Sequence, residues 1–248
     1  MTITTLIVPG LNSSGSAHWQ SWFETRLPDA VRVIQSDWKR ANLPEWSSRI
    51  RREIARRSGP VLIAAHSFGA LAAVQAAEDY RERVQGALLV APADPDKFGV
   101  AGALPEGPLG FPATLVASAN DPWLSVDKAF ALALRWGADF VDLGAAGHIN
   151  AESGFGPWPF GLSLLRQLET RRVWEGGRGA GGTDPVPAAG RRLVTPEAAA
   201  ALAKWREQPA RTRRARSSGS EATIADDVSG FVASPRSAWA TVRGNPGV

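Results

Sequence analysis

The sequence predicts a three-layer α/β domain in which helices cover both faces of a parallel β-sheet. Within residues 1–172, short apolar runs rich in β-branched residues alternate with helical stretches, at a spacing typical of βαβ units. Segments such as Val61–Ala65 are apolar at every position, as expected of a strand that is covered on both faces. These observations favour an α/β/α sandwich.

Each short apolar run is predicted to be one strand of this sheet. The six strands are expected at Thr4–Val8, Val31–Gln35, Val61–Ala65, Gly86–Ala91, Ala113–Ser118 and Phe140–Leu143. The helices are expected at Ala17–Leu27, Pro44–Arg57, Gly69–Asp79, Val126–Trp136 and Pro159–Glu169. Pro44 suits a helix start, where its missing N–H has no acceptor to lose.

Residues 173–248 differ in composition and are predicted to form a mostly disordered tail rich in Gly, Pro and Arg. The chain carries a net charge of +4, but residues 1–172 hold 17 basic and 17 acidic residues, so the excess charge belongs to the tail. The tail contains a glycine-rich run at 176–182, one short predicted helix at 196–207 and an arginine-rich run at 211–216. A solvated tail is favoured over one that binds nucleic acid or acidic lipid.

The remaining composition excludes several classes of protein. No apolar run is long enough to span a membrane and no basic segment precedes the first strand, so we expect a cytoplasmic protein that does not act at a membrane. The chain has no Cys and only three His, which argues against a thiol nucleophile, a disulfide or a histidine-rich metal site. We expect no metal and no other cofactor.

The end of the third predicted strand carries the strongest chemical signal. Ala65-His66-Ser67-Phe68-Gly69 joins an apolar strand to a helix of small residues, which fits a nucleophile elbow with Ser67 projecting above the sheet. The alternative is that Ser67 merely caps the helix. The pattern favours Ser67 as the nucleophile, although alanine replaces the first glycine of the usual motif.

A serine nucleophile needs an imidazole base and a carboxylate that orients the base. Asp121 follows the fifth strand and His148 follows the sixth, so the chain order Ser, Asp, His matches the order in α/β-hydrolases. Asp94 and Asp96, after the fourth strand, are rival acids. Asp121 could instead be only a turn residue, and His148 only a structural loop residue.

His66 and His18 are expected to have structural roles. His66 directly precedes Ser67, so its side chain should point away from the hydroxyl, and His18 opens the first predicted helix. An acyl transfer also needs donors for the oxyanion, and these are expected to be the backbone N–H of Phe68 together with that of Leu11 or Asn12.

Several stretches together resemble the small α/β-hydrolases of the YdeN and retinoblastoma-binding-protein type, a family of predicted serine esterases. They are Val8–Ser14, His18–Gln20, Ala65–Gly69, Val90–Asp94, Ala117–Pro122 and Gly144–Asn150. The resemblance covers residues 1–172, and bacterial members share the alanine at the first elbow position. It implies a minimal α/β-hydrolase fold with six parallel strands in the order 2-1-3-4-5-6, and a triad of Ser67, Asp121 and His148.

The expected function is that of a serine hydrolase that cleaves small uncharged carboxylic esters through an acyl-enzyme. Phe98, Trp123, Phe155 and Trp158 are expected to line a partly apolar substrate pocket, although they could equally pack beneath the loops. No Arg or Lys lies in the three triad loops to bind a charged substrate. The alternative is a catalytically idle interaction module of the same fold. The expected partner is a small-molecule ester, and the expected state a monomer or small homo-oligomer.

Overall fold

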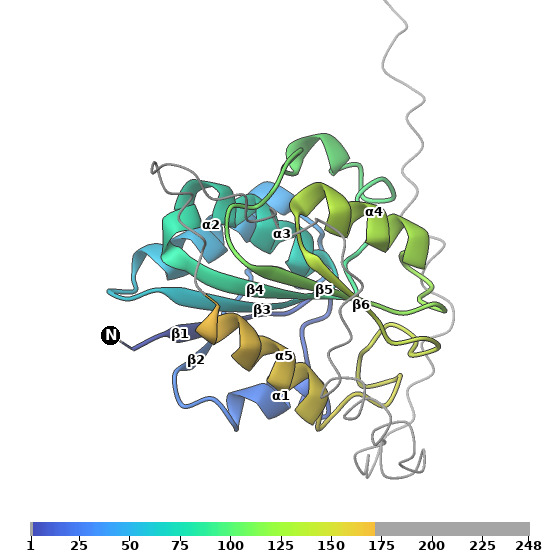
Figure 1. Ribbon diagram of the computed structural model, residues 1–248, viewed down its shortest axis with the longest axis horizontal. Coiled ribbons are helices and arrows are strands. Elements are labelled where there is room, and N and C mark those ends of the chain that lie inside the picture. The colour runs from blue at the N-terminus through green and yellow to red at the C-terminus, as the bar shows by residue number, and fades with distance from the viewer. Residues whose placement is uncertain (1, 172–248) are drawn as a thin grey trace, which may run out of the picture. The chain divides into compact units, whose positions relative to one another are not determined.

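The computed structural model describes residues 2–171, which form a six-stranded sheet with helices on both faces (Figure 1). The strands are β1 (Thr4–Val8), β2 (Ala30–Arg32), β3 (Val61–His66), β4 (Val84–Val90), β5 (Ala113–Ala117) and β6 (Asp139–Asp142). Every neighbouring pair is parallel, and the spatial order is β2-β1-β3-β4-β5-β6. The predicted fold class and strand order are therefore confirmed.

The helices are divided between the two faces of the sheet. They are α1 (Trp19–Glu24), α2 (Leu43–Ala55), α3 (Phe68–Ala77), α4 (Val126–Trp136) and α5 (Pro159–Thr170), with short 3₁₀ helices η1 (Glu78–Arg83) and η2 (Ala101–Ala103). Figure 1 shows α2, α3 and α4 on one face and α1 and α5 on the other. This arrangement leaves the carboxyl edge of the sheet to the connecting loops.

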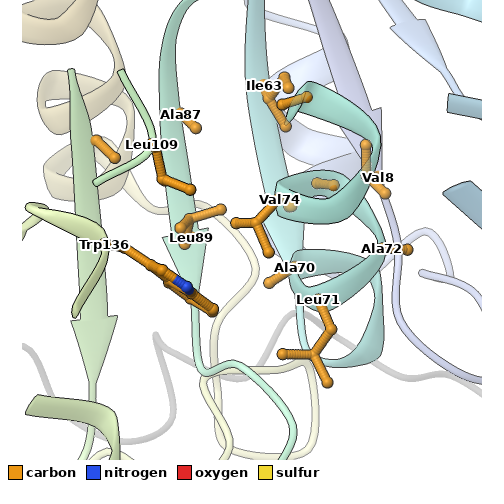
Figure 2. Packing of buried hydrophobic residues seen from close by; sticks show 14 of the residues in the cluster. Val8, Ile63, Ala70, Leu71, Ala72, Val74, Ala87, Leu89, Leu109 and Trp136 are labelled. Atoms are coloured by element: carbon orange, nitrogen blue, oxygen red, sulfur yellow. The ribbon is translucent and has the colours of Figure 1, made fainter. Parts of the chain in front are cut away.

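Alternation along the strands divides the core into two clusters. In β3, Ile63 and Ala65 join the cluster on the α3 face, whereas Leu62 and Ala64 join the cluster on the α5 face. Figure 2 shows the α3 side, where Val74, Leu89 and Trp136 are directed into one cluster. Because both faces are covered, all six residues of β3 are buried, as its continuous apolar sequence predicted.

Helix α3 is nearly all Ala, Gly, Leu and Val, and every residue of it except Gln75 is buried. A helix made of small residues can approach the sheet closely and still be covered on its outer side by α2. This buried helix begins immediately after Ser67, so the position of Ser67 is fixed by the packing of α3 on the sheet.

Most elements differ from their predicted bounds by one or two residues, and the largest differences are in β2 and α1. Strand β2 was expected to reach Gln35, but it pairs with β1 only at Ala30–Arg32; the N–H of Val33 still donates to Ile7 (2.9 Å), after which the chain leaves the sheet. Helix α1 is shorter than expected because His18 caps its start and the hydroxyl of Thr25 bonds to the Trp22 carbonyl at its end.

Predictions about residues 173–248 lie outside the described part of the chain, and the domain boundary at residue 172 stays a prediction. Helix α5 ends at Thr170, close to that boundary. Among residues 2–171, no helix has both the length and the apolar character needed to cross a membrane.

Candidate active site

The structure brings Ser67, Asp121 and His148 together at the carboxyl edge of the sheet, as the sequence predicted. Ser67 follows β3, Asp121 follows β5 and His148 follows β6. Ser67 Oγ lies 3.0 Å from His148 Nε2, and His148 Nδ1 lies 3.0 Å from both carboxylate oxygens of Asp121. The side chains of His148 and Asp121 are only 11% and 2% exposed, so this hydrogen-bonded chain is largely protected from solvent.

Ser67 lies on a strained turn. Its φ of 54° and ψ of −129° are values that a non-glycine residue adopts only under constraint, at a cost of about 1–3 kcal/mol. Although Ser67 precedes α3, its hydroxyl makes no capping hydrogen bond, so the helix-cap interpretation is wrong. The strain instead directs the hydroxyl toward the imidazole.

Glycine is required at Gly69, within the elbow, and at Gly10, in the loop after β1 that packs against it. A Cβ added to Gly69 would lie 2.2 Å from the Pro9 carbonyl oxygen, because α3 passes directly over the end of β1. A Cβ on Gly10 would lie 2.7 Å from the Ser67 Cβ. The loop after β1 therefore lies in contact with the elbow, which is the position an oxyanion-binding loop needs.

Asp121 is held in place by its own loop as well as by His148. Its Oδ1 accepts the backbone N–H of Trp123 at 2.9 Å. A carboxylate in this position accepts Nδ1–H from the imidazole and so leaves Nε2 free to accept the Ser67 hydroxyl proton. Asp121 therefore makes its turn contact and also binds the imidazole of His148.

The rival acids are engaged elsewhere. Lys128 Nζ lies 2.8 Å from Asp94 Oδ2 and 2.9 Å from Asp96 Oδ2. Burial of Asp94 opposes its ionisation, but hydrogen bonds from Lys128 and the backbone N–H of Asp96 outweigh burial and lower the pKa of Asp94. Neither carboxylate has a hydrogen bond to His148, so Asp121 is the partner of the imidazole.

His66 and His18 have the structural contacts expected of them. His18 Nδ1 accepts the N–H of Gln20 at 3.1 Å, and burial, then Arg32 and His148, lower the pKa of His18 to about 3. His66 Nε2 lies 2.9 Å from the backbone oxygen of His148. Burial, followed by the neighbouring His18 and His148, holds the pKa of His66 well below its ordinary value. Both rings are therefore neutral at pH 7.

The oxyanion candidates differ in whether their N–H groups are free. Phe68 is the first residue of α3, so its N–H has no acceptor within the helix. The N–H of Asn12 donates to the Trp38 carbonyl at 2.8 Å, whereas no residue within 2–171 accepts a hydrogen bond from the N–H of Leu11. Leu11 is therefore the better placed of the two loop residues.

The four predicted pocket residues separate into two pairs. Phe98 is partly exposed and packs on Phe68 with ring centroids 5.1 Å apart; Trp123 is 38% exposed and its ring lies 6.1 Å from that of His148. Phe155 and Trp158 are 1% and 0% exposed and belong to the core cluster on the α5 face. Their prediction as pocket walls is wrong, because both pack against other core side chains.

Several polar residues that hold the loop Gly144–Asn150, named the base loop here after the candidate base His148, were not predicted from the sequence. Asn120 Oδ1 accepts the N–H of Gly147 at 2.7 Å, and Ser118 Oγ accepts that of Ala146 at 3.0 Å. Ser153 Oγ accepts the N–H of His148 at 3.1 Å. The signal available in the sequence was that a glycine-rich loop outside the sheet needs side-chain acceptors for its N–H groups where it packs on the domain, and short polar residues lie in and beside both loops.

Comparison with known proteins gives the family of this chain. The family model described as serine hydrolase matches residues 5–167. The chain belongs to the serine hydrolase family. No curated protein matches it.

Two solved structures place this serine hydrolase among proteins of the YdeN type. A YdeN-like hydrolase from Pectobacterium atrosepticum is similar at 43% identity and a TM-score of 0.65, over 68% of this chain and 91% of that one. The YdeN gene product of B. subtilis has 18% identity and a TM-score of 0.58, over 68% and 100% of the two chains.

More distant hydrolases share the fold. Est1E from Butyrivibrio proteoclasticus, solved with ferulic acid bound, has 11% identity and a TM-score of 0.51, over 68% of this chain and 87% of that one. The family match and the hydrolases of known structure support a hydrolase function for this chain. Within residues 2–171, no group of three or more His, Asp or Glu could hold a metal ion.

Proposed function

We propose that the protein is a carboxylic-ester hydrolase in which Ser67, His148 and Asp121 form a catalytic triad. The observation that carries the proposal is the continuous hydrogen-bonded chain from Ser67 Oγ through His148 to Asp121, with all contacts at 3.0 Å. A serine hydroxyl is a weak nucleophile until a base takes its proton, and this chain supplies the base and its orienting carboxylate.

In the acylation step, Ser67 Oγ attacks the ester carbonyl carbon as its proton passes to His148 Nε2. Asp121 holds Nδ1–H and stabilises the imidazolium that results. The N–H groups of Phe68 and Leu11 would bind the oxyanion of the tetrahedral intermediate. A donor of this kind is commonly worth about 3–4 kcal/mol of transition-state stabilisation.

Collapse of the intermediate breaks the ester C–O bond, and the alcohol leaves with the proton from His148 Nε2. A water molecule then gives a proton to His148 as its oxygen attacks the acyl carbon. The second tetrahedral intermediate releases the carboxylic acid and returns the proton to Ser67 Oγ. In each half of the reaction His148 acts first as the base and then as the acid.

Small uncharged esters fit the surroundings of Ser67 best. The nearby side chains of Phe98 and Trp123 are apolar and partly exposed. The nearby lysines already have partners: Lys97 donates to the carbonyl oxygens of Pro122 and Trp123, and Lys128 of α4 binds Asp94 and Asp96. A carboxylate on the substrate would lose hydration on burial and would have to compete with these partners for a lysine.

Labelling with a fluorophosphonate tests the proposal directly. The wild-type protein should be labelled covalently and should hydrolyse p-nitrophenyl acetate and butyrate faster than an ester of the same size that carries a free carboxylate. Ser67→Ala should lose both the label and the hydrolysis, while Ser163→Ala, a surface change on α5, should keep both. A folded wild-type protein that takes no label would instead support an idle interaction module.

A further inference from the structure

His148 is attached to the elbow at two points, and only one of them belongs to the triad. Its ring Nε2 contacts Ser67 Oγ, and its backbone oxygen lies 2.9 Å from Nε2 of His66, the residue directly before Ser67. The rings of His66 and His148 are 4.8 Å apart between centroids. Two consecutive residues of one turn therefore bind the backbone and the ring of the same histidine.

The second contact fixes the proton of His66. A carbonyl oxygen can only accept a hydrogen bond, so Nε2 of His66 must carry the hydrogen. His66 is 5% exposed and its pKa lies well below the ordinary value, so the ring is a neutral donor. A neutral ring at this place also adds no positive charge that would oppose formation of the His148 imidazolium.

His66 is itself held by the start of α1. The ring of His18 packs edge-on against it, with centroids 4.9 Å apart and planes at 70°. The neighbouring Trp19 also meets the His66 ring edge-on, and its Nε1–H donates to the carbonyl of Ile149 at 2.9 Å. Ile149 has a φ of 50°, so the base loop is bent sharply directly after His148.

We propose that His66 is a positioning residue, whose Nε2–H binds the His148 carbonyl and thereby sets the imidazole at hydrogen-bond distance from Ser67 Oγ. This role rests on the proposed function, since it concerns the base of the same triad. His66 touches neither the substrate nor the reacting atoms. Because His66 and Ser67 are consecutive residues of the elbow, the bond keeps the hydroxyl and the imidazole at a fixed position relative to each other.

The expected consequence is an effect on proton transfer and not on substrate binding. Without the His66 bond, the His148 backbone can shift away from the elbow and carry the ring with it. A displacement of about 1 Å at a catalytic group can lower the rate by as much as 100-fold. The apolar side chains near Ser67 would be unaffected, so KM should change little.

Three variants separate positioning from simple packing. His66→Phe keeps an aromatic ring but removes the donor, and kcat for p-nitrophenyl acetate should fall about 10- to 100-fold with KM within about twofold. His66→Gln places an amide N–H at a similar reach and should recover kcat to within about threefold of wild type. Trp136→Phe removes a comparable buried bond to a backbone carbonyl, that of Pro105, away from the site, and should leave kcat unchanged.

The outcomes distinguish this inference from the proposed function. If wild type is labelled and active but His66→Phe keeps the wild-type kcat, or if His66→Gln is as slow as His66→Phe, the positioning role is wrong and the triad stands. If wild type has no activity or label, both proposals fail. Nitrogen NMR of the wild-type ring at pH 7 tests the role even if His66→Phe does not fold: a neutral Nε2–H tautomer is expected, and a neutral Nδ1–H tautomer or a charged ring would overturn it.

Discussion

The two loops that meet at the candidate active site are held in different ways. The elbow around Ser67 is fixed by neighbouring backbone, since Gly69 passes so close to the end of β1 that no side chain fits between them. The loop that carries His148 is fixed by side chains, most of them from distant segments. Asn120 and Ser153 accept its N–H groups, while His66 and Trp19 donate to its carbonyls.

This difference predicts different responses to substitution. A change in the elbow forces backbone atoms apart and should lower the stability of the whole domain. A change in the support of the base loop removes one hydrogen bond but leaves the sheet and its helices intact, so it should lower the rate more than the stability.

Asp121→Asn should have the largest effect on the reaction rate and little effect on stability. The amide keeps the shape of the carboxylate but favours the wrong imidazole tautomer and cannot stabilise the imidazolium, so kcat for p-nitrophenyl acetate should fall about 10³- to 10⁴-fold. Asp96→Asn, a change in the rival acidic loop, is the matched control and should stay within about twofold of wild type. Equal losses in the two variants would refute the assignment of the acid.

Gly69→Ala should have the largest effect on stability. The new Cβ would meet the Pro9 oxygen at 2.2 Å, and separating the helix from the strand should lower the free energy of unfolding by about 3 kcal/mol or more, measured with urea. Gly102→Ala places its Cβ in open space and should change it by less than about 0.5 kcal/mol. Similar stabilities in the two variants would contradict the close approach.

Asn120→Ala should have an intermediate effect that appears mainly in the rate. The N–H of Gly147 loses its acceptor, and the hydroxyl of Ser118 keeps only the Gly144 carbonyl. The base loop should loosen, and kcat should fall about tenfold with a stability loss of about 1 kcal/mol. Ser163→Ala, which removes a hydroxyl bonded within α5, should leave kcat unchanged. A loss of stability without a loss of rate would show that this bond does not help to position His148.

Lys128→Met should have the smallest effect. It should lower the stability of the fold slightly, and only at pH values where Asp94 is ionised. In the fold the pKa of Asp94 lies below its ordinary value of 3.8, so the ion pair stabilises the native state above that value and loses this effect as the pH falls through the lowered pKa. The variant should be slightly less stable than wild type at pH 7, and the difference in urea unfolding should shrink below about pH 4. A difference that grows in acid would contradict this sign.

The elbow could be read from the sequence because its determinants are local. A fully apolar strand, a serine and a helix of small residues follow one another within one short segment, and the backbone geometry they require excludes larger side chains. The order of Ser67, Asp121 and His148 along the chain was equally visible, because parallel strands bring the residues that follow them to one edge of the sheet.

The surroundings of the site could not be read in the same way. Phe155 and Trp158 follow the base loop in sequence, yet they are buried in the core on the α5 face. Leu11 and Asn12 are neighbours, and only the bond from Asn12 to the Trp38 carbonyl distinguishes their N–H groups. Side-chain direction and hydrogen-bond partners depend on segments that are distant in sequence, which no local pattern encodes.

Local sequence patterns were therefore enough to predict the sheet, the strained turn and the serine on it, because periodicity and glycine sterics act over a few neighbouring residues. The assembled fold was needed to separate Asp121 from its rivals as the partner of the imidazole and to show how the base loop is held. Lys128 occupies Asp94 and Asp96, and His66 binds the His148 carbonyl. These contacts join residues separated by tens of positions, so they exist only once the strands have assembled.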